Sequence, residues 1–145
     1  MRALVQRSLN SSVKVDDKIV GQINKGLVVL VGFTDTDSSK EIDYIIDKII
    51  NLRIFDDEDG IMNKSVLDIN GSILSISQFT LYADASKGRR PSYVKAMKNG
   101  DASKLYDKFN EKLKERINVE MGVFGADMKV NIINDGPVTI MLESK

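Results

Sequence analysis

Apolar and polar residues alternate along the start of the chain, as they do in strands with one buried face. Ala3, Val5 and Leu9 would form the buried face of a first strand, and Asp16-Asp17 would make a turn. The strands expected in this part are residues 1–10, 11–15, 19–23 and 27–31. The last of these is apolar throughout, from Leu27 to Val31, and this predicts a central strand buried on both faces.

The pattern changes to a helical one after Asp35. Apolar residues then recur at helical spacing, at Ile42, Ile45, Ile46, Ile49 and Leu52. Asp37 or Ser38 could cap the start of this helix, whose apolar stripe would face the core. The acidic run Asp56–Gly60 that follows lacks the alternating ligands of a calcium loop, so it is expected to be a solvated turn.

The second half mixes strands and helices. Asn70-Gly71 predicts a tight hairpin turn between a strand at 65–69 and another from Ser72 to Leu81. A short helix is expected at 92–98, closed by Asn99-Gly100. A longer helix would follow, capped by Asp101 or Ser103, with Leu105, Phe109, Leu113 and Ile117 facing inward. Residues 121–128 are expected to be a loop, and 129–133 and 138–142 the last strands, interrupted by a turn at Asn134–Pro137.

Composition limits the chemistry more sharply than any motif. The 145 residues suit one domain, 1–145, and contain neither histidine nor cysteine. Catalytic triads and dyads that need His or Cys, disulfides and the usual zinc sites are therefore excluded, and no metal or cofactor is expected. No apolar run is long enough to cross a membrane, and the start does not resemble a signal peptide, so a cytoplasmic protein is expected.

Charge is balanced overall but unevenly distributed. Asp35–Asp59 holds nine acids and three bases, whereas Lys87–Gly100 holds five bases and no acid. Such a basic segment is a candidate landing site for a polyanion.

The most informative stretch is Ser77–Ser92. Hydroxyl and amide side chains (Ser77, Gln78, Thr80) precede a loop with three cations (Lys87, Arg89, Arg90). This arrangement indicates a polar pocket beside an anion site. An edge strand followed by a solvated basic turn is the structural alternative.

Four motifs in this order resemble one family along the whole chain: MRALVQR, SQFTLYAD, FGADM and GPVT. The family is that of the D-aminoacyl-tRNA deacylases. The resemblance implies an α+β fold, in which a barrel-like, mostly antiparallel sheet is flanked by helices, and a homodimer. It also implies hydrolysis of the ester between a D-amino acid and the 3′ end of tRNA.

The resemblance further implies roles for individual residues. Ser77, Gln78, Phe79 and Thr80 match the catalytic strand, with main-chain N–H groups around Gln78 and Phe79 as an oxyanion hole. Gly136-Pro137 matches a cis peptide that enters the partner subunit's active site and excludes L side chains. Three further sets match family positions: Phe124 and Met128 for the terminal adenine, Arg7 for support of the Gly-Pro loop, and Lys87, Arg89 and Arg90 for tRNA phosphates.

Three functional hypotheses follow. In the first, the protein hydrolyses D-aminoacyl-tRNA and also glycyl-tRNA, with the 2′-OH of the terminal ribose assisting the attack of water. In the second, it is a non-catalytic RNA-binding dimer. In the third, Thr80 is the nucleophile of a hydrolase of small D-amino-acid esters, although no base is evident to activate it. No membrane or DNA partner is expected.

Overall fold

The sheet is built on a hairpin of two long strands, β1 (Arg2–Val15) and β2 (Lys18–Gly32). The computed structural model describes residues 1–144. Asp16 and Asp17 both have positive φ (47° and 61°), which confirms the expected turn. The strand β1 is longer than expected, because residues 1–10 and 11–15 form one strand with an irregularity beside Asn10 (φ 45°).

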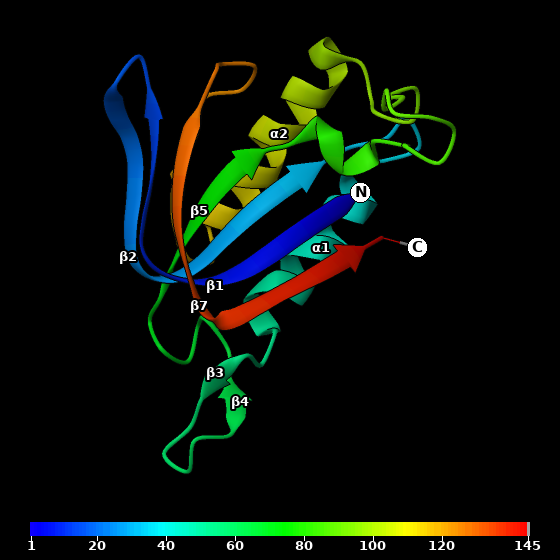
Figure 1. Ribbon diagram of the computed structural model, residues 1–145. Coiled ribbons are helices and arrows are strands. Elements are labelled where there is room, and N and C mark those ends of the chain that lie inside the picture. Colours follow the sequence, from blue (N-terminus) through cyan, green and yellow to red (C-terminus); the bar gives the residue numbers. More distant parts are fainter. Residues whose placement is uncertain (145) are drawn as a thin grey trace.

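Five strands form the main sheet, in the order β6-β5-β2-β1-β7. The remaining members are β5 (Ser72–Ser77), β6 (Asn118–Met121) and β7 (Lys129–Glu143). The β1–β2 and β1–β7 pairs are antiparallel, and the β2–β5 and β5–β6 pairs are parallel. The sheet is therefore mixed, although its two longest pairings are antiparallel as expected. Figure 1 shows β1, β2 and β7 bending sharply, and a separate small ribbon, β3 (Phe55–Asp56) with β4 (Met62–Lys64), projecting below them.

Two helices, α1 (Ser39–Asn51) and α2 (Asn99–Lys114), cover one face of the sheet (Figure 1). The expected start of α1 is confirmed: the Ser38 hydroxyl accepts from the Lys40 N–H, and the Glu41 carboxylate accepts from the Ser38 N–H at 2.8 Å. Neither helix in residues 1–144 is long and apolar enough to span a membrane.

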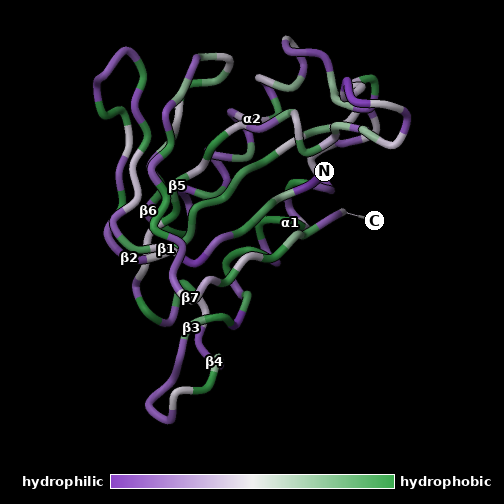
Figure 2. Tube along the Cα trace, in the orientation of Figure 1, coloured by the Kyte–Doolittle hydropathy of each residue, from purple (hydrophilic) through white to green (hydrophobic). Residues whose placement is uncertain are grey.

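The core confirms that the Leu27–Val31 part of β2 is buried on both faces. Leu27 and Val29 belong to the cluster that packs under the helices, whereas Val28 belongs to a smaller cluster on the opposite face. Figure 2 shows the corresponding hydrophobic colouring along the central strands and polar colouring at the projecting loops. Each such aliphatic side chain contributes roughly 1.5–3 kcal/mol when fully buried.

The hairpin expected at Asn70-Gly71 is wrong. Residues 66–70 form a turn, in which Gly71 N–H donates to the Val66 carbonyl at 2.9 Å, and β5 pairs in parallel with β2 and β6 instead. The start of β5 runs very close to β2, because a Cβ added to Gly26 would lie 1.8 Å from the Ser72 carbonyl oxygen.

The segment after β5 also differs from the prediction. The strand ends at Ser77, and Phe79–Tyr82 form a short 3-10 helix, η1. The helix expected at 92–98 is absent: residues 92–97 form a bridge and a turn, and Met97 N–H donates to the Phe33 carbonyl at 2.9 Å, which holds the chain along the end of β2.

The predicted start of the longer helix, α2, is also wrong. Asn99 and Gly100 open α2 rather than close a helix, and neither expected cap is correct, since the N-cap is Lys98. Phe109 and Leu113 are buried as expected, and Leu105 and Ile117 are partly buried.

The turn expected at Asn134–Pro137 does not end a strand. The β1–β7 register passes from Ser8–Asn134 directly to Gln6–Thr139, so residues 135–138 project from a continuous β7. This projection is called the Gly136 bulge below.

Candidate active site

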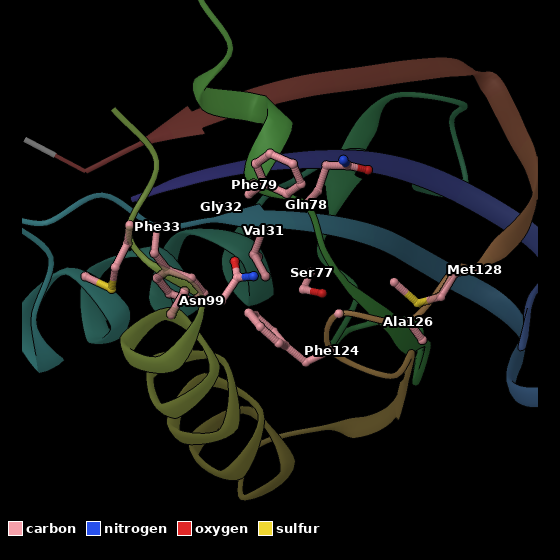
Figure 3. Close-up of a pocket in the computed structure, with 13 residues that line it drawn as sticks. Val31, Gly32, Phe33, Ser77, Gln78, Phe79, Asn99, Phe124, Ala126 and Met128 are labelled. Atoms are coloured by element: carbon pink, nitrogen blue, oxygen red, sulfur yellow. The ribbon is translucent and has the colours of Figure 1, made fainter. Parts of the chain in front are cut away.

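A pocket of about 340 Å³ opens at the end of β5, beside the end of β2 and the start of α2 (Figure 3). Four segments form its wall: the end of β2, the turn from β5 into η1, the segment that enters α2, and the loop after β6. Its lining residues are Val31, Gly32, Phe33, Ser77, Gln78, Phe79, Met97, Asn99, Ala102, Phe124, Gly125, Ala126 and Met128. Of the expected site residues, Ser77, Gln78, Phe79, Phe124 and Met128 are thus brought together.

The main chain at the end of β5 is fixed against β2. Gln78 N–H donates to the Val31 carbonyl at 2.7 Å, so it is not available as the oxyanion donor that the resemblance implied. The N–H groups of Phe79 and Thr80 donate no hydrogen bond to any acceptor within residues 1–144. Two adjacent main-chain donors are therefore free beside the pocket. Gly32 permits this approach, since a Cβ there would lie 2.7 Å from the Gln78 carbonyl oxygen.

Thr80 itself lies outside the pocket wall. It is exposed, and its hydroxyl is hydrogen-bonded to the side-chain amide of Gln78. The hydroxyl that points toward the pocket in Figure 3 is that of Ser77.

The loop after β6 supplies the apolar wall. The Phe124 ring packs on Tyr106 of α2, with 5.9 Å between ring centroids, and Met128 Sδ packs so closely on Gly122 that a Cβ there would lie 2.5 Å away. The Tyr106 hydroxyl donates to the Ser75 carbonyl at 2.9 Å. Burial raises the pKa of Tyr106, which therefore stays neutral beneath the pocket.

Among the residues that the structure describes, no titratable side chain lines the pocket. Its polar groups are the Ser77 hydroxyl, the amides of Gln78 and Asn99, and the main chain. Such a wall can position a substrate and stabilise a developing oxyanion, but it offers no side chain with a pKa suited to general-base catalysis. Asn99 and Met97 were missed as lining residues, because their sequence was interpreted as the end of a helix.

The Gly136 bulge lies away from this pocket, at the bend of β7 near β3 (Figure 1). The Gly136-Pro137 peptide is cis, and both residues are exposed. Arg7 of β1 holds the bulge: its Nε donates to the Asp135 carbonyl at 3.3 Å and lies 3.1 Å from the Asp135 carboxylate. Its Nη1 donates to the Ile54 carbonyl at 2.8 Å, which ties the bulge to the segment that leads into β3.

The three expected phosphate-binding cations lie on an exposed loop near the pocket. Lys87, Arg89 and Arg90 form no ion pair with any residue in 1–144. Two hydrogen bonds of 2.8 Å between Asp84 and Ser92 close this loop, called the basic loop below. Hydrogen bonds from Ser86 lower the pKa of Asp84, so its carboxylate stays charged at the base of the loop.

Comparison with known proteins identifies a family that spans nearly the whole chain. The family model described as D-Tyr-tRNA(Tyr) deacylase matches residues 4–143. The chain is 56% identical, over all of its length and 98% of the relative's, to the D-aminoacyl-tRNA deacylase of Clostridium botulinum (strain 657 / Type Ba4).

Two solved structures share the fold. The c-Myc DNA Unwinding Element Binding Protein is 42% identical with a TM-score of 0.95, covering 100% of this chain and 99% of that one. A probable eukaryotic D-amino acid tRNA deacylase is 20% identical with a TM-score of 0.83, covering 97% of both chains, and this likeness concerns the fold alone. The match of a family model to nearly the whole chain, together with a full-length relative at 56% identity, shows that this chain belongs to the D-Tyr-tRNA(Tyr) deacylase family of enzymes.

Proposed function

We propose that the protein hydrolyses the ester that joins a D-amino acid to the 3′ end of tRNA, and so keeps D-amino acids out of translation in the cytoplasm. The observation that carries this proposal is the composition of one pocket. Ser77, Gln78 and Phe79 from the end of β5 and Phe124 and Met128 from a distant loop line it together, and no titratable side chain does.

In this proposal the terminal adenine packs on Phe124 and Met128, which directs the ester toward the turn after Ser77. The free N–H groups of Phe79 and Thr80 stabilise the oxyanion as the carbonyl becomes tetrahedral. The 2′-OH of the terminal ribose orients the attacking water. The water oxygen bonds to the carbonyl carbon, and the bond between that carbon and the ribose 3′-oxygen breaks. One proton of the water passes to the 3′-oxygen, and the other is released to solvent from the new carboxyl group. Free D-amino acid and tRNA leave.

The chiral filter is assigned to the Gly136 bulge of a second copy of the chain. In this homodimer the main-chain carbonyls of Gly136-Pro137 face the substrate's α-carbon and leave no room for an L side chain. The bulge is exposed, lies outside its own chain's pocket and is held in place by Arg7, as a part that acts on a partner needs to be. Because glycine has no side chain, the same filter admits glycyl-tRNA.

The decisive assay compares D-tyrosyl-tRNA with L-tyrosyl-tRNA, each ending in adenosine or 2′-deoxyadenosine. We expect hydrolysis of the D ester alone and a large loss of rate with 2′-deoxyadenosine. Between pH 5 and 9 or so, the rate should show no inflection from a protein group, since none lines the pocket. Binding of both tRNAs without release of tyrosine would favour the RNA-binding dimer. Full activity on the 2′-deoxy substrate would favour Thr80 as a nucleophile.

A mixing experiment tests the cross-subunit filter. Ala126→Trp blocks the pocket, and Gly136→Val blocks the filter, because Gly136 has φ 118° and an added Cβ would lie 2.9 Å from the Val138 side chain. Each variant alone should be inactive. A heterodimer carries one intact site, so random mixing should restore about a quarter of the sites. Mixtures that stay inactive, although subunit exchange is shown by mass spectrometry, would place both parts of the site on one chain.

A further inference from the structure

Two aromatic rings lie exposed at the edge of the pocket. Phe79, which lines the pocket, is 52% exposed, and Tyr93 is 42% exposed. Their centroids are 5.1 Å apart, and the rings meet edge to face at 68°. An edge-to-face pair uses one face of only one ring, so flat ring surface is left open to solvent. Figure 3 shows the Phe79 ring at the pocket rim.

The Tyr93 segment is rigidly anchored although it has no regular structure. Before Tyr93, Ser92 is bound to Asp84 by two main-chain hydrogen bonds. After it, the Lys95 carbonyl accepts from the Thr34 hydroxyl at 2.7 Å, and Met97 reaches the pocket wall. Tyr93 is therefore held on the rim, within a few residues of the pocket.

Positive charge is concentrated in the segment that carries Tyr93. Lys87–Gly100 contains five bases and no acid, and although Lys95 lies 3.8 Å from the Asp84 carboxylate, the three cations of the basic loop have no acidic partner in residues 1–144. Exposed aromatic rings beside unpaired cations form the surface that unpaired nucleic-acid strands bind: the bases stack on the rings and the phosphates meet the cations.

We propose that Tyr93, supported by Phe79, is a stacking platform for a base of the unpaired 3′ end of tRNA, the one next to the terminal adenosine. This inference rests on the proposed function, in which the terminal adenosine occupies the pocket. The chain of the RNA then leaves the pocket past Phe79 and Tyr93 and runs toward the basic loop. Tyr93 would thus position the substrate without touching the reacting ester.

The first experiment compares two substrates that differ only in the RNA beyond the last nucleotide: a D-tyrosyl minihelix and D-tyrosyl-adenosine. We expect Tyr93→Leu to lower the kcat/KM for the minihelix, divided by that for D-tyrosyl-adenosine, by about 5- to 150-fold. This is the effect of losing one base stack. Tyr93→Phe keeps the ring and should keep the ratio. Tyr44→Leu is the matched control, because Tyr44 on α1 is 41% exposed and does not line the pocket.

The second experiment needs no catalysis, so it separates this inference from the proposed function. An uncharged minihelix carries 2-aminopurine next to its terminal adenosine, and stacking quenches the fluorescence of this base. We expect quenching with the wild type, Tyr93→Phe and Tyr44→Leu, and its loss with Tyr93→Leu. Persistent quenching in Tyr93→Leu would overturn the proposal. An equal loss of kcat/KM on both substrates in Tyr93→Leu, together with dissociation of the oligomer in sedimentation, would also overturn the proposal. Tyr93 would then be a subunit contact.

Discussion

Arg7 offers the sharpest test of how the Gly136 bulge is held. Its side chain is only 11% exposed and donates to the carbonyls of Ile54 and Asp135, while it also faces the carboxylates of Asp135 and Asp56. Hydrogen bonds from a charged donor contribute about 1.5–3 kcal/mol each, and the two carboxylates add little because they are partly or largely exposed. The bond to Asp135 is long, at 3.3 Å, so we count the bond to Ile54 in full and that one at the low end or below, and Arg7→Ala should lower the free energy of unfolding by about 2–4 kcal/mol.

The same substitution should also slow catalysis. Without Arg7 the bulge is no longer tied to Ile54, and a displacement of about 1 Å in a positioning group can cost about 100-fold in rate. Arg7→Lys keeps the charge but cannot reach both carbonyls with one planar group, so it should recover stability better than activity. The measurements are urea unfolding and the rate of D-tyrosyl-tRNA hydrolysis under conditions in which every variant is folded.

Arg53→Ala is the matched control for Arg7. Arg53 also makes two hydrogen bonds, both to Asn63, but in an exposed setting, and its loss should cost about 1 kcal/mol or less. If Arg7→Ala costs no more than Arg53→Ala, or if Arg7→Lys hydrolyses the substrate at the wild-type rate, the assigned role of Arg7 is wrong.

Three other predictions follow from the site and its surroundings. Thr80→Ala should retain substantial activity, because the Thr80 hydroxyl lies outside the pocket; a covalent aminoacyl adduct on Thr80 in mass spectra would contradict this. Replacing Lys87, Arg89 and Arg90 by Ala should flatten the salt dependence of tRNA binding by roughly 0.7–0.9 in log–log slope per lost phosphate contact, and an unchanged slope would move the RNA footprint elsewhere. Burial raises the pKa of Tyr82 to about 12, above its unfolded value of about 10, so stability present below pH 10 should be lost as pH rises to 12. Tyr82→Phe should remove that part of the loss, up to ~2 kcal/mol, in unfolding measured across this range.

Local sequence signals predicted those elements whose cause is local. The Ser38 capping box starts α1 where its side chains can reach the first N–H groups. The apolar run from Leu27 to Val31 marks a strand buried on both faces, whatever its neighbours are.

Local sequence signals could not predict which distant segments pair with one another. Asn70-Gly71 carries a strong hairpin signal, yet β5 pairs with β2 and β6, which lie far away in sequence. α2 starts at Asn99, just after a long-range hydrogen bond holds Met97 to Phe33, and no periodicity reveals such a contact.

The site shows the same division. The motifs predicted that Ser77–Phe79 and Phe124 belong to one site, and the structure places them in one pocket. The individual main-chain donors could not be predicted, because the loss of Gln78 N–H to the Val31 carbonyl depends on how β5 ends against β2.

The close contact between Gly26 and Ser72 has a consequence for how the chain tolerates insertions. It pins one end of the β2–β5 ladder, and the Gln78–Val31 hydrogen bond pins the other. A slip of one residue between these points would turn Ser77 to the opposite face of the sheet. Extra residues in the acidic turn at Gly60, whose Cβ position meets no atom within 4 Å, leave this ladder unchanged. The β3–β4 tip can therefore vary in length or accept a grafted segment, whereas β5 accepts neither an insertion nor a deletion.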